Sequence, residues 1–147
     1  MKVTDTARER MCMMASLSDY PAAAVLRAED LVRAKRFYTD VLGLRQRDFP
    51  GPAGEGIAVF AAGAGSMIMI YERPGMPAPQ NTALGFGVPA GKFDEIAADL
   101  RARGVTFEDY DLPDTGLKTV DGIAEMPGAR AAWFKDSEGN IVNIAAM

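Results

Sequence analysis

The order of apolar and polar residues predicts that one structural pattern occurs twice along the chain. In the first half, apolar residues recur every three or four positions over 31–42, the spacing of a helix with one buried face. Asp30 stands at the N-cap position of this helix, and Gly43 stands at its C-terminal end. Strands are predicted around the helix over 22–28, 44–49, 57–62 and 66–71.

The second half repeats this order after a proline-rich linker. Residues 73–79 contain Pro74, Pro77 and Pro79 and cannot continue a strand or a helix. A second helix is predicted over 92–103, with Gly104 at its end. Strands are predicted over 82–88, 105–111, 130–135 and 141–145. Each half therefore has the order β-α-β-β-β, which gives modules over about 21–73 and 80–147.

The composition is typical of one soluble globular domain. Hydrophobic residues make up 48% of the 147 residues and charged residues 24%, and the net charge is −4. An acidic chain does not favour a nucleic-acid partner. No apolar run is long enough to span a bilayer, so no membrane partner is expected. Residues 1–20 show no clear period and lack a signal-peptide pattern; we expect an N-terminal extension to a domain over 21–147 and a cytoplasmic location.

The chain contains no histidine, and this excludes several kinds of active site. Histidine is the commonest transition-metal ligand and the only side chain whose unperturbed pKa lies near neutrality. Histidine-based zinc sites, Ser-His-Asp triads and Cys-His dyads are therefore excluded. The one cysteine, Cys12, excludes an internal disulfide. Any catalysis would have to use carboxylates, Lys, Tyr, Arg, backbone groups or a bound cofactor.

Three stretches of the sequence resemble the vicinal oxygen chelate superfamily, which includes glyoxalases, bleomycin-resistance proteins, extradiol dioxygenases and fosfomycin-resistance enzymes. They read LRAEDLVRAKRFYTDVLGL, DEIAADLRARGV and AAWFKDSEGNIVNI. The resemblance covers roughly residues 20–146, and the segment over 104–141 is similar to a bacterial subgroup described as glyoxalase-like. It implies an α+β fold in which two βαβββ modules form a cupped mixed sheet around a cavity.

The positions that hold metal in this superfamily carry other residues here. The resemblance implies one ligand, usually His, Gln or Glu, on the first and last strand of each module. These positions correspond to Ala23, about Met69, Ala83 and Asn143. Carbonyl and hydroxyl oxygens without a carboxylate would hold a divalent ion weakly. We therefore expect no metal ligands and no cofactor, which favours the metal-free branch that resembles bleomycin-resistance proteins.

Strand alternation predicts which side chains line the cavity. If Ala23 faces it, every second residue on the same strand does so too, and the same holds for the other strands. Alternation assigns to the cavity five predicted ligand-binding residues, Arg27, Met67, Met69, Tyr71 and Asn143, and Trp133 is added as a further wall residue. Such a cup would suit a flat or aromatic ligand. The alternatives are that the methionines and aromatic residues only fill the core, that Asn143 pairs with backbone, and that Arg27 pairs with Glu29 or Asp30.

Catalytic candidates are confined to a few acids and one lysine. They are Glu72, Asp109, Lys118 and Asp121. The segment 109–122 also contains Tyr110 and could close over the cup as a lid, and groups buried together there could transfer protons. The alternative is that these side chains are simply solvated. Residues 136–140 are predicted to form a turn before the last strand.

The sequence leaves three functions open. The first is a metal-independent protein of resistance or carrier type that binds a largely apolar or aromatic small molecule. The second is an enzyme of the same superfamily, a lyase, an isomerase or a dioxygenase-like protein, that uses Asp, Glu, Lys and Tyr or a non-standard metal site. The third is a dimeric interaction module with a closed cavity. Small members of the superfamily expose sheet edges and an open cup that partners often cover, so the resemblance implies a homodimer.

Overall fold

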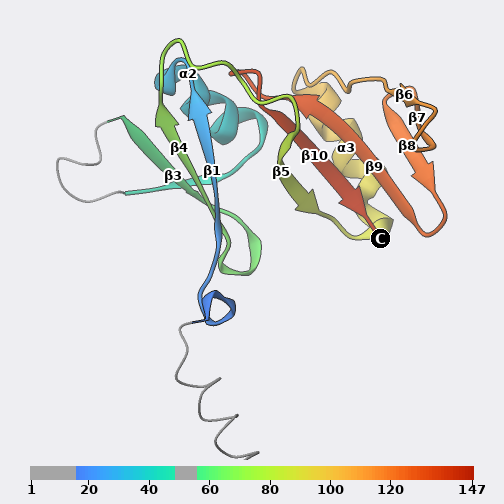
Figure 1. Cartoon of the computed structure of the whole chain (residues 1–147), viewed down its shortest axis with the longest axis horizontal. Helices are drawn as coiled ribbons and strands as arrows, with labels where there is room; N and C mark the ends of the chain where they lie inside the picture. The colour runs from blue at the N-terminus through green and yellow to red at the C-terminus, as the bar shows by residue number, and fades with distance from the viewer. Residues whose placement is uncertain (1–15, 49–55) are drawn as a thin grey trace, which may run out of the picture.

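The computed structural model describes residues 16–48 and 56–147, which form two modules side by side (Figure 1). A short 3-10 helix, η1 (Leu17–Asp19), precedes the first module. The first module contains β1 (Ala23–Ala28), α2 (Leu31–Arg36), η2 (Phe37–Val41), β2 (Arg45–Arg47), β3 (Ile57–Ala61), η4 (Gly63–Gly65) and β4 (Met67–Glu72). Its four strands have the order β1-β4-β3-β2, in which only β1 and β4 run parallel.

The second module has the larger sheet. It contains β5 (Thr82–Gly87), η5 (Ala90–Lys92), α3 (Phe93–Ala102), β6 (Asp111–Leu112), β7 (Leu117–Val120), β8 (Ile123–Met126), β9 (Ala129–Lys135) and β10 (Ile141–Ala146). The six strands have the order β5-β10-β9-β8-β7-β6. Edge strands β1 and β5 come close to each other where the two sheets meet. The two mixed sheets and their helices confirm the predicted α+β fold, and the sheets form an open cup rather than a closed barrel.

The strand predicted over 105–111 is wrong, and the segment after it contains strands that the sequence did not predict. Phe107 forms only an isolated bridge to Phe134, and a hairpin of β6 and β7 follows. The carboxylate of Asp109 accepts hydrogen bonds from the Thr119 hydroxyl (2.9 Å) and the Gly122 N–H (2.8 Å). Such side-chain bonds compete with ladder bonds and end the strand. The segment 109–122 is thus partly a hairpin and not a loop throughout.

The first helix begins as predicted and then changes its winding. The side chain of Asp30 accepts a hydrogen bond from the Arg33 N–H at 3.2 Å, which confirms the N-cap. After Arg36 the helix widens to π geometry over η2, and Gly43 ends it at a φ of +72°. Helix α2 packs on β3 and β4, while α3 packs on β10.

One hydrophobic core runs through both modules on the side of the sheets that carries the helices. A chain of aromatic contacts crosses the junction: Tyr38 packs on Phe60 and Phe37, with ring centroids 5.7 Å apart in each pair. Phe37 of the first module then reaches Phe134 of the second at 6.5 Å. The modules therefore share apolar burial and are not independent units.

Three features of the sequence lie outside the described residues. They are most of the expected N-terminal extension, which includes Cys12, the end of the strand predicted over 44–49, and the turn at residues 50–52. Within residues 16–48 and 56–147, no helix combines the length and the hydropathy needed to cross a membrane.

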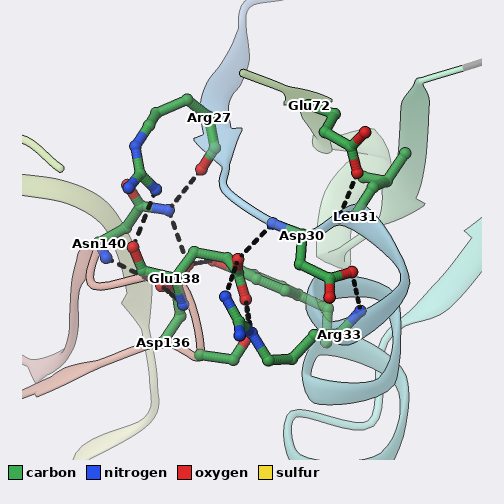
Figure 2. Close-up of polar contacts among 10 residues, drawn as sticks. Arg27, Asp30, Leu31, Arg33, Glu72, Asp136, Glu138 and Asn140 are labelled. Carbon is green, nitrogen blue, oxygen red and sulfur yellow. Dashed lines mark hydrogen bonds and ion pairs between the residues drawn. The ribbon is translucent and has the colours of Figure 1, made fainter. Parts of the chain in front are cut away.

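A buried turn over 136–140 joins the second module to the first (Figure 2). One carboxylate oxygen of Asp136 accepts the N–H groups of Glu138 and Asn140 at 2.8 Å, and the other accepts the Tyr38 hydroxyl at 2.6 Å. The Asn140 amide donates to the carbonyl of Arg27 at 2.9 Å. Asn140 is 1% exposed, so these bonds lie where water cannot replace them.

The Arg27 and Glu138 side chains complete this inter-module network. The Arg27 guanidinium donates to the carbonyls of Met76 and Glu138, each at 2.8 Å. The Glu138 carboxylate accepts a bidentate pair from Arg33 at 2.8 and 2.9 Å and the Asp30 N–H at 2.9 Å (Figure 2). Because every one of these bonds joins residues far apart in the chain, the network sets how the two modules sit against each other.

The ionised Glu138 carboxylate is stabilised in the folded state. Burial alone would raise the pKa of Glu138, but the hydrogen bonds from Arg33, Ser137 and the Asp30 N–H outweigh it and lower the pKa to about 2. Between that value and the ordinary value of 4.5, the unfolded chain binds more protons at this carboxyl than the folded chain. The stability that Glu138 contributes is therefore present above pH 4.5 and is lost as the pH falls towards 2.

We expect Glu138→Gln to remove this part of the pH dependence. Lowering the pH from 4.5 to about 2 should cost the wild-type protein about 2–3 kcal/mol more free energy of unfolding than the variant. Urea unfolding at several pH values measures this difference. The other carboxylates titrate in both proteins, so their contributions to the pH dependence cancel in the comparison. Parallel loss of stability in the two proteins would contradict the role given to Glu138.

Candidate functional site

The faces of the two sheets that point away from the helices are open. In β1 and β4, alternate residues are buried against the helices, and their neighbours lie on the open face. Ala23 pairs with Met67 and Val25 with Met69 on that face. Val25 is 56% exposed and Met67 42% exposed, so this face presents apolar surface to solvent.

The second sheet continues this face with one amide and one indole. Asn143 of β10 pairs with Trp133 of β9 on one side and with Gly85 of β5 on the other. Gly85 has no Cβ, and one placed there would collide with the Asn143 side-chain oxygen. The missing side chain at position 85 therefore leaves the space that the Asn143 amide occupies.

Trp133 lies in the wall of a cavity of about 310 Å³. Tyr110 packs edge to face against Trp133, with ring centroids 5.7 Å apart and an angle of 84° between the rings. The other residues that line the cavity are Gln80, Asn81, Thr82, Leu112, Leu117 and Ile141. Burial and the nearby Glu108 raise the pKa of Tyr110 further above neutrality. A tyrosine hydroxyl is protonated at neutral pH even without this shift, so it can donate a hydrogen bond.

The structure brings some of the predicted ligand-binding residues together and separates others. Met67, Met69 and Tyr71 lie along one strand, β4, but they do not line the Trp133 cavity. The guanidinium of Arg73 covers the Tyr71 ring at 4.6 Å from its centroid. Arg27 is 9% exposed, and its guanidinium is engaged in the inter-module network.

The four catalytic candidates do not form one cluster. Glu72 accepts the Leu31 N–H at 2.8 Å and so satisfies the start of α2 (Figure 2). Asp109 accepts bonds from its own loop, as described above. Lys118 is exposed on β7, and the Asp121 side chain is 93% exposed, at a residue whose φ is +53°.

Tyr110 gains its place from contacts that the sequence did not show. The Glu108 N–H donates to the Trp133 carbonyl at 2.7 Å, and Phe107 bridges to Phe134. These two contacts hold residues 107–110 along β9, and Tyr110 then reaches the indole. The sequence offers Tyr110 as part of a proton-transfer segment with Asp109 and Lys118, whereas in the structure its ring packs against Trp133.

The sequence model of the Glyoxalase/Bleomycin resistance protein/Dioxygenase superfamily matches residues 21–144. The chain belongs to this superfamily. This agrees with the resemblance seen in the sequence, and the match covers both modules and the network between them. No curated protein matches the sequence significantly.

Solved structures of this superfamily share the fold. A glyoxalase family protein from Bacillus anthracis superposes with a TM-score of 0.70 at 18% identity, over 90% of this chain and 98% of that one. A glyoxalase/bleomycin resistance protein/dioxygenase from Nocardioides gives 0.63 at 21%, over 97% and 92%. The fosfomycin resistance protein FosX from Listeria monocytogenes, in complex with Mn(II) and sulfate, gives 0.61 at 18%, over 91% and 94%.

In this chain, the side chains at the positions that hold metal in the superfamily do not fit a metal ion. Ala23 and Ala83 carry no donor atom, Met69 offers a thioether, and Asn143 offers one amide oxygen. Within residues 16–48 and 56–147, no group of three or more His, Cys, Asp or Glu side chains is placed to hold a metal. A hard divalent cation needs several oxygen ligands, commonly with at least one carboxylate. The side chains at these four positions therefore do not support a catalytic step that uses a metal ion there.

We expect a methyl group at position 85 to displace the Asn143 amide. Gly85→Ala should lower the free energy of unfolding by about 1–2 kcal/mol, because the added carbon overlaps the amide oxygen. Chemical denaturation measures the change, and Gly87→Ala on the same strand is the control, since a Cβ there has nothing within 4 Å. In an Asn143→Ala background the cost of Gly85→Ala should disappear; an unchanged cost would contradict the contact.

Proposed function

We propose that this protein is a metal-independent small-molecule-binding member of the superfamily, of resistance or carrier type, with a largely apolar or aromatic ligand on its open face. The observation that carries the proposal is the cavity in which Trp133 and Tyr110 meet edge to face. Two aromatic rings at a right angle can offer one face and one edge to a flat ligand. The volume of about 310 Å³ is within the range of small-molecule sites.

A few polar groups around the cavity can orient such a ligand. Gln80, Asn81 and Thr82 line the cavity, and the Tyr110 hydroxyl, which is protonated at neutral pH, can donate a hydrogen bond. Asn143 lies beside Trp133 on the neighbouring strand. Apolar walls with few polar groups favour an uncharged or weakly polar aromatic compound over a highly charged one.

The placement of the acids supports binding over catalysis. Asp109 and Glu72 use their carboxylates to satisfy backbone N–H groups, and Asp121 points to solvent. Proton transfer needs an acid or base within hydrogen-bond reach of the reacting atom. None of these three groups lines the Trp133 cavity, so the proposal assigns no catalytic residue.

We expect the wall formed by Trp133 and Tyr110 to dominate the affinity. In a screen of one- to three-ring aromatic compounds, hits should change Trp133 fluorescence, since this is the only tryptophan. Tyr110→Ala should weaken binding by about 1–2 kcal/mol, and Trp133→Ala should weaken it at least as much, measured by calorimetry. Tyr71→Ala and Met69→Ala should weaken binding only if the ligand extends across the face to β4.

Three controls make this experiment specific. Tyr20→Ala removes an exposed tyrosine outside both modules, and Lys118→Ala and Asp121→Ala change the other candidate segment. All three should leave the affinity unchanged, and so should a chelator, because the proposed site uses no metal. Compounds that raise the melting temperature but leave Trp133 fluorescence unchanged would show that this wall is not the site.

A homodimer is the second part of the proposal. Val25 and Met67 expose apolar surface on the open face, and a second copy of the chain would cover it. The described part of the chain also leaves β2 and β6 as sheet edges. A second copy of the chain on this face would also partly enclose the Trp133 cavity of each chain.

We expect light scattering to report about twice the chain mass of 15.7 kDa at micromolar concentration. Val25→Asp should shift the protein to the monomer, because a carboxylate on the covered face would lose its hydration. Val32→Asp is the matched control, since Val32 is 59% exposed on α2 and lies away from the open face. A wild-type monomer at this concentration would contradict the dimer.

A further inference from the structure

A second apolar pocket, of about 160 Å³, lies where the two modules meet on the helix side of the sheets. Its walls come from the end of η2, from β5, from α3 and from β9 and β10. All eight residues that line it have apolar side chains. It is partly open to solvent, so a small molecule can reach it without unfolding of the domain.

The winding of the first helix creates one wall of this pocket. In η2 the Leu42 N–H donates to the Phe37 carbonyl at 3.1 Å, and the Leu44 N–H donates to the Tyr38 carbonyl at 2.9 Å. Gly43, at a φ of +72°, turns the chain between the two leucines. Leu42 and Leu44 thereby reach the second module, so that a ligand between them and α3 would contact both modules.

This pocket is separate from the open face. Phe134 and Ile144 line it, and they alternate along β9 and β10 with Trp133 and Asn143. Because neighbouring residues in a strand point to opposite faces, the pocket lies behind the sheet that carries the Trp133 cavity. The two sites can therefore be tested independently.

We propose that this pocket binds a small, uncharged, apolar molecule of about the size of one aromatic ring. The pocket volume limits the size of the ligand: a dry cavity of about 150 Å³ lined by Leu, Ile and Phe is known to hold benzene or xenon. The lining decides the chemistry, because a charged or strongly polar ligand would lose its hydration without gaining a hydrogen bond. A filled pocket would also gain dispersion contacts that an empty one lacks.

Binding there would stabilise the junction between the modules. Leu42 and Leu44 belong to the first module, and Phe86, Val88, Ile96 and Leu100 belong to the second. A ligand that contacts both groups binds only when the modules are docked, so mass action favours the docked form. The proposal rests on the geometry of this pocket and does not depend on the function proposed for the open face.

Benzene is the probe for the test, with methyl-labelled Leu, Ile and Val followed by NMR. Saturable shifts are expected at Leu42, Leu44, Val88 and Ile96, while Val25 on the open face stays unchanged. Val88→Phe fills the pocket and should weaken benzene binding at least tenfold. Val32→Phe adds the same ring to an exposed position on α2 and should leave binding unchanged. If Val88→Phe does not fold, Ile96→Phe fills the same pocket from α3.

Each outcome decides the proposal. Saturable shifts at the pocket methyls that a filling variant abolishes support it, and they should persist in Trp133→Ala, which tests the open face separately. Shifts confined to Val25 and to methyls near Trp133 would overturn it. So would pocket methyl shifts that follow protein concentration without benzene, since these would show that a second copy of the chain fills the pocket. Benzene binding that the filling variants leave unchanged would also overturn it.

Discussion

The buried turn over 136–140 is the contact on which the arrangement of the two modules depends. It places two carboxylates, one side-chain amide and one backbone carbonyl of the second module against Arg27, Asp30 and Tyr38 of the first. These groups have lost their hydration, so breaking the contact would leave several of them unsatisfied at once. The aromatic contact between Phe37 and Phe134 adds apolar burial at the same junction. Together these contacts keep β1 and β5 side by side.

The hydrogen bonds of two charged side chains explain why the open face is largely apolar. Two charged residues that alternation or position would assign to the site, Arg27 and Glu72, satisfy backbone groups elsewhere. Val25, Met67 and Met69 remain on the first sheet, and Trp133 and Asn143 remain on the second. Arg27 thus helps to hold the modules together and Glu72 satisfies the start of α2, and the face that remains suits an apolar or aromatic ligand.

The second sheet serves different purposes on its two faces. Trp133 and Asn143 face the open side, where Tyr110 adds a ring from a neighbouring segment. Phe134 and Ile144, their neighbours in the chain, face the shared core and the second apolar pocket. The period of two in a β-strand therefore lets two short strands contribute to two separate cavities. A change at one face can be made without changing the side chains of the other.

Local signals in the sequence determined the parts of this protein that depend on near neighbours. Asp30 and Gly43 mark the ends of the first helix because capping needs only residues within one turn. Alternation placed Met67, Met69 and Tyr71 on one face of their strand for the same reason. The missing histidine and the alanines at positions 23 and 83 likewise excluded a histidine-based metal site without any structure.

The tertiary structure alone decided the contacts between distant segments. Arg27 meets Glu138 across more than one hundred residues, and no periodicity or propensity contains that pairing. The pattern at Val105 and Phe107 resembles a strand, but the hydrogen bonds of Asp109 with Thr119 and Gly122 end it. Tyr110 meets Trp133 only because residues 107–110 follow β9. None of these three features can be read from neighbouring residues, since each is set by the free energy of a contact that exists only after the chain has folded.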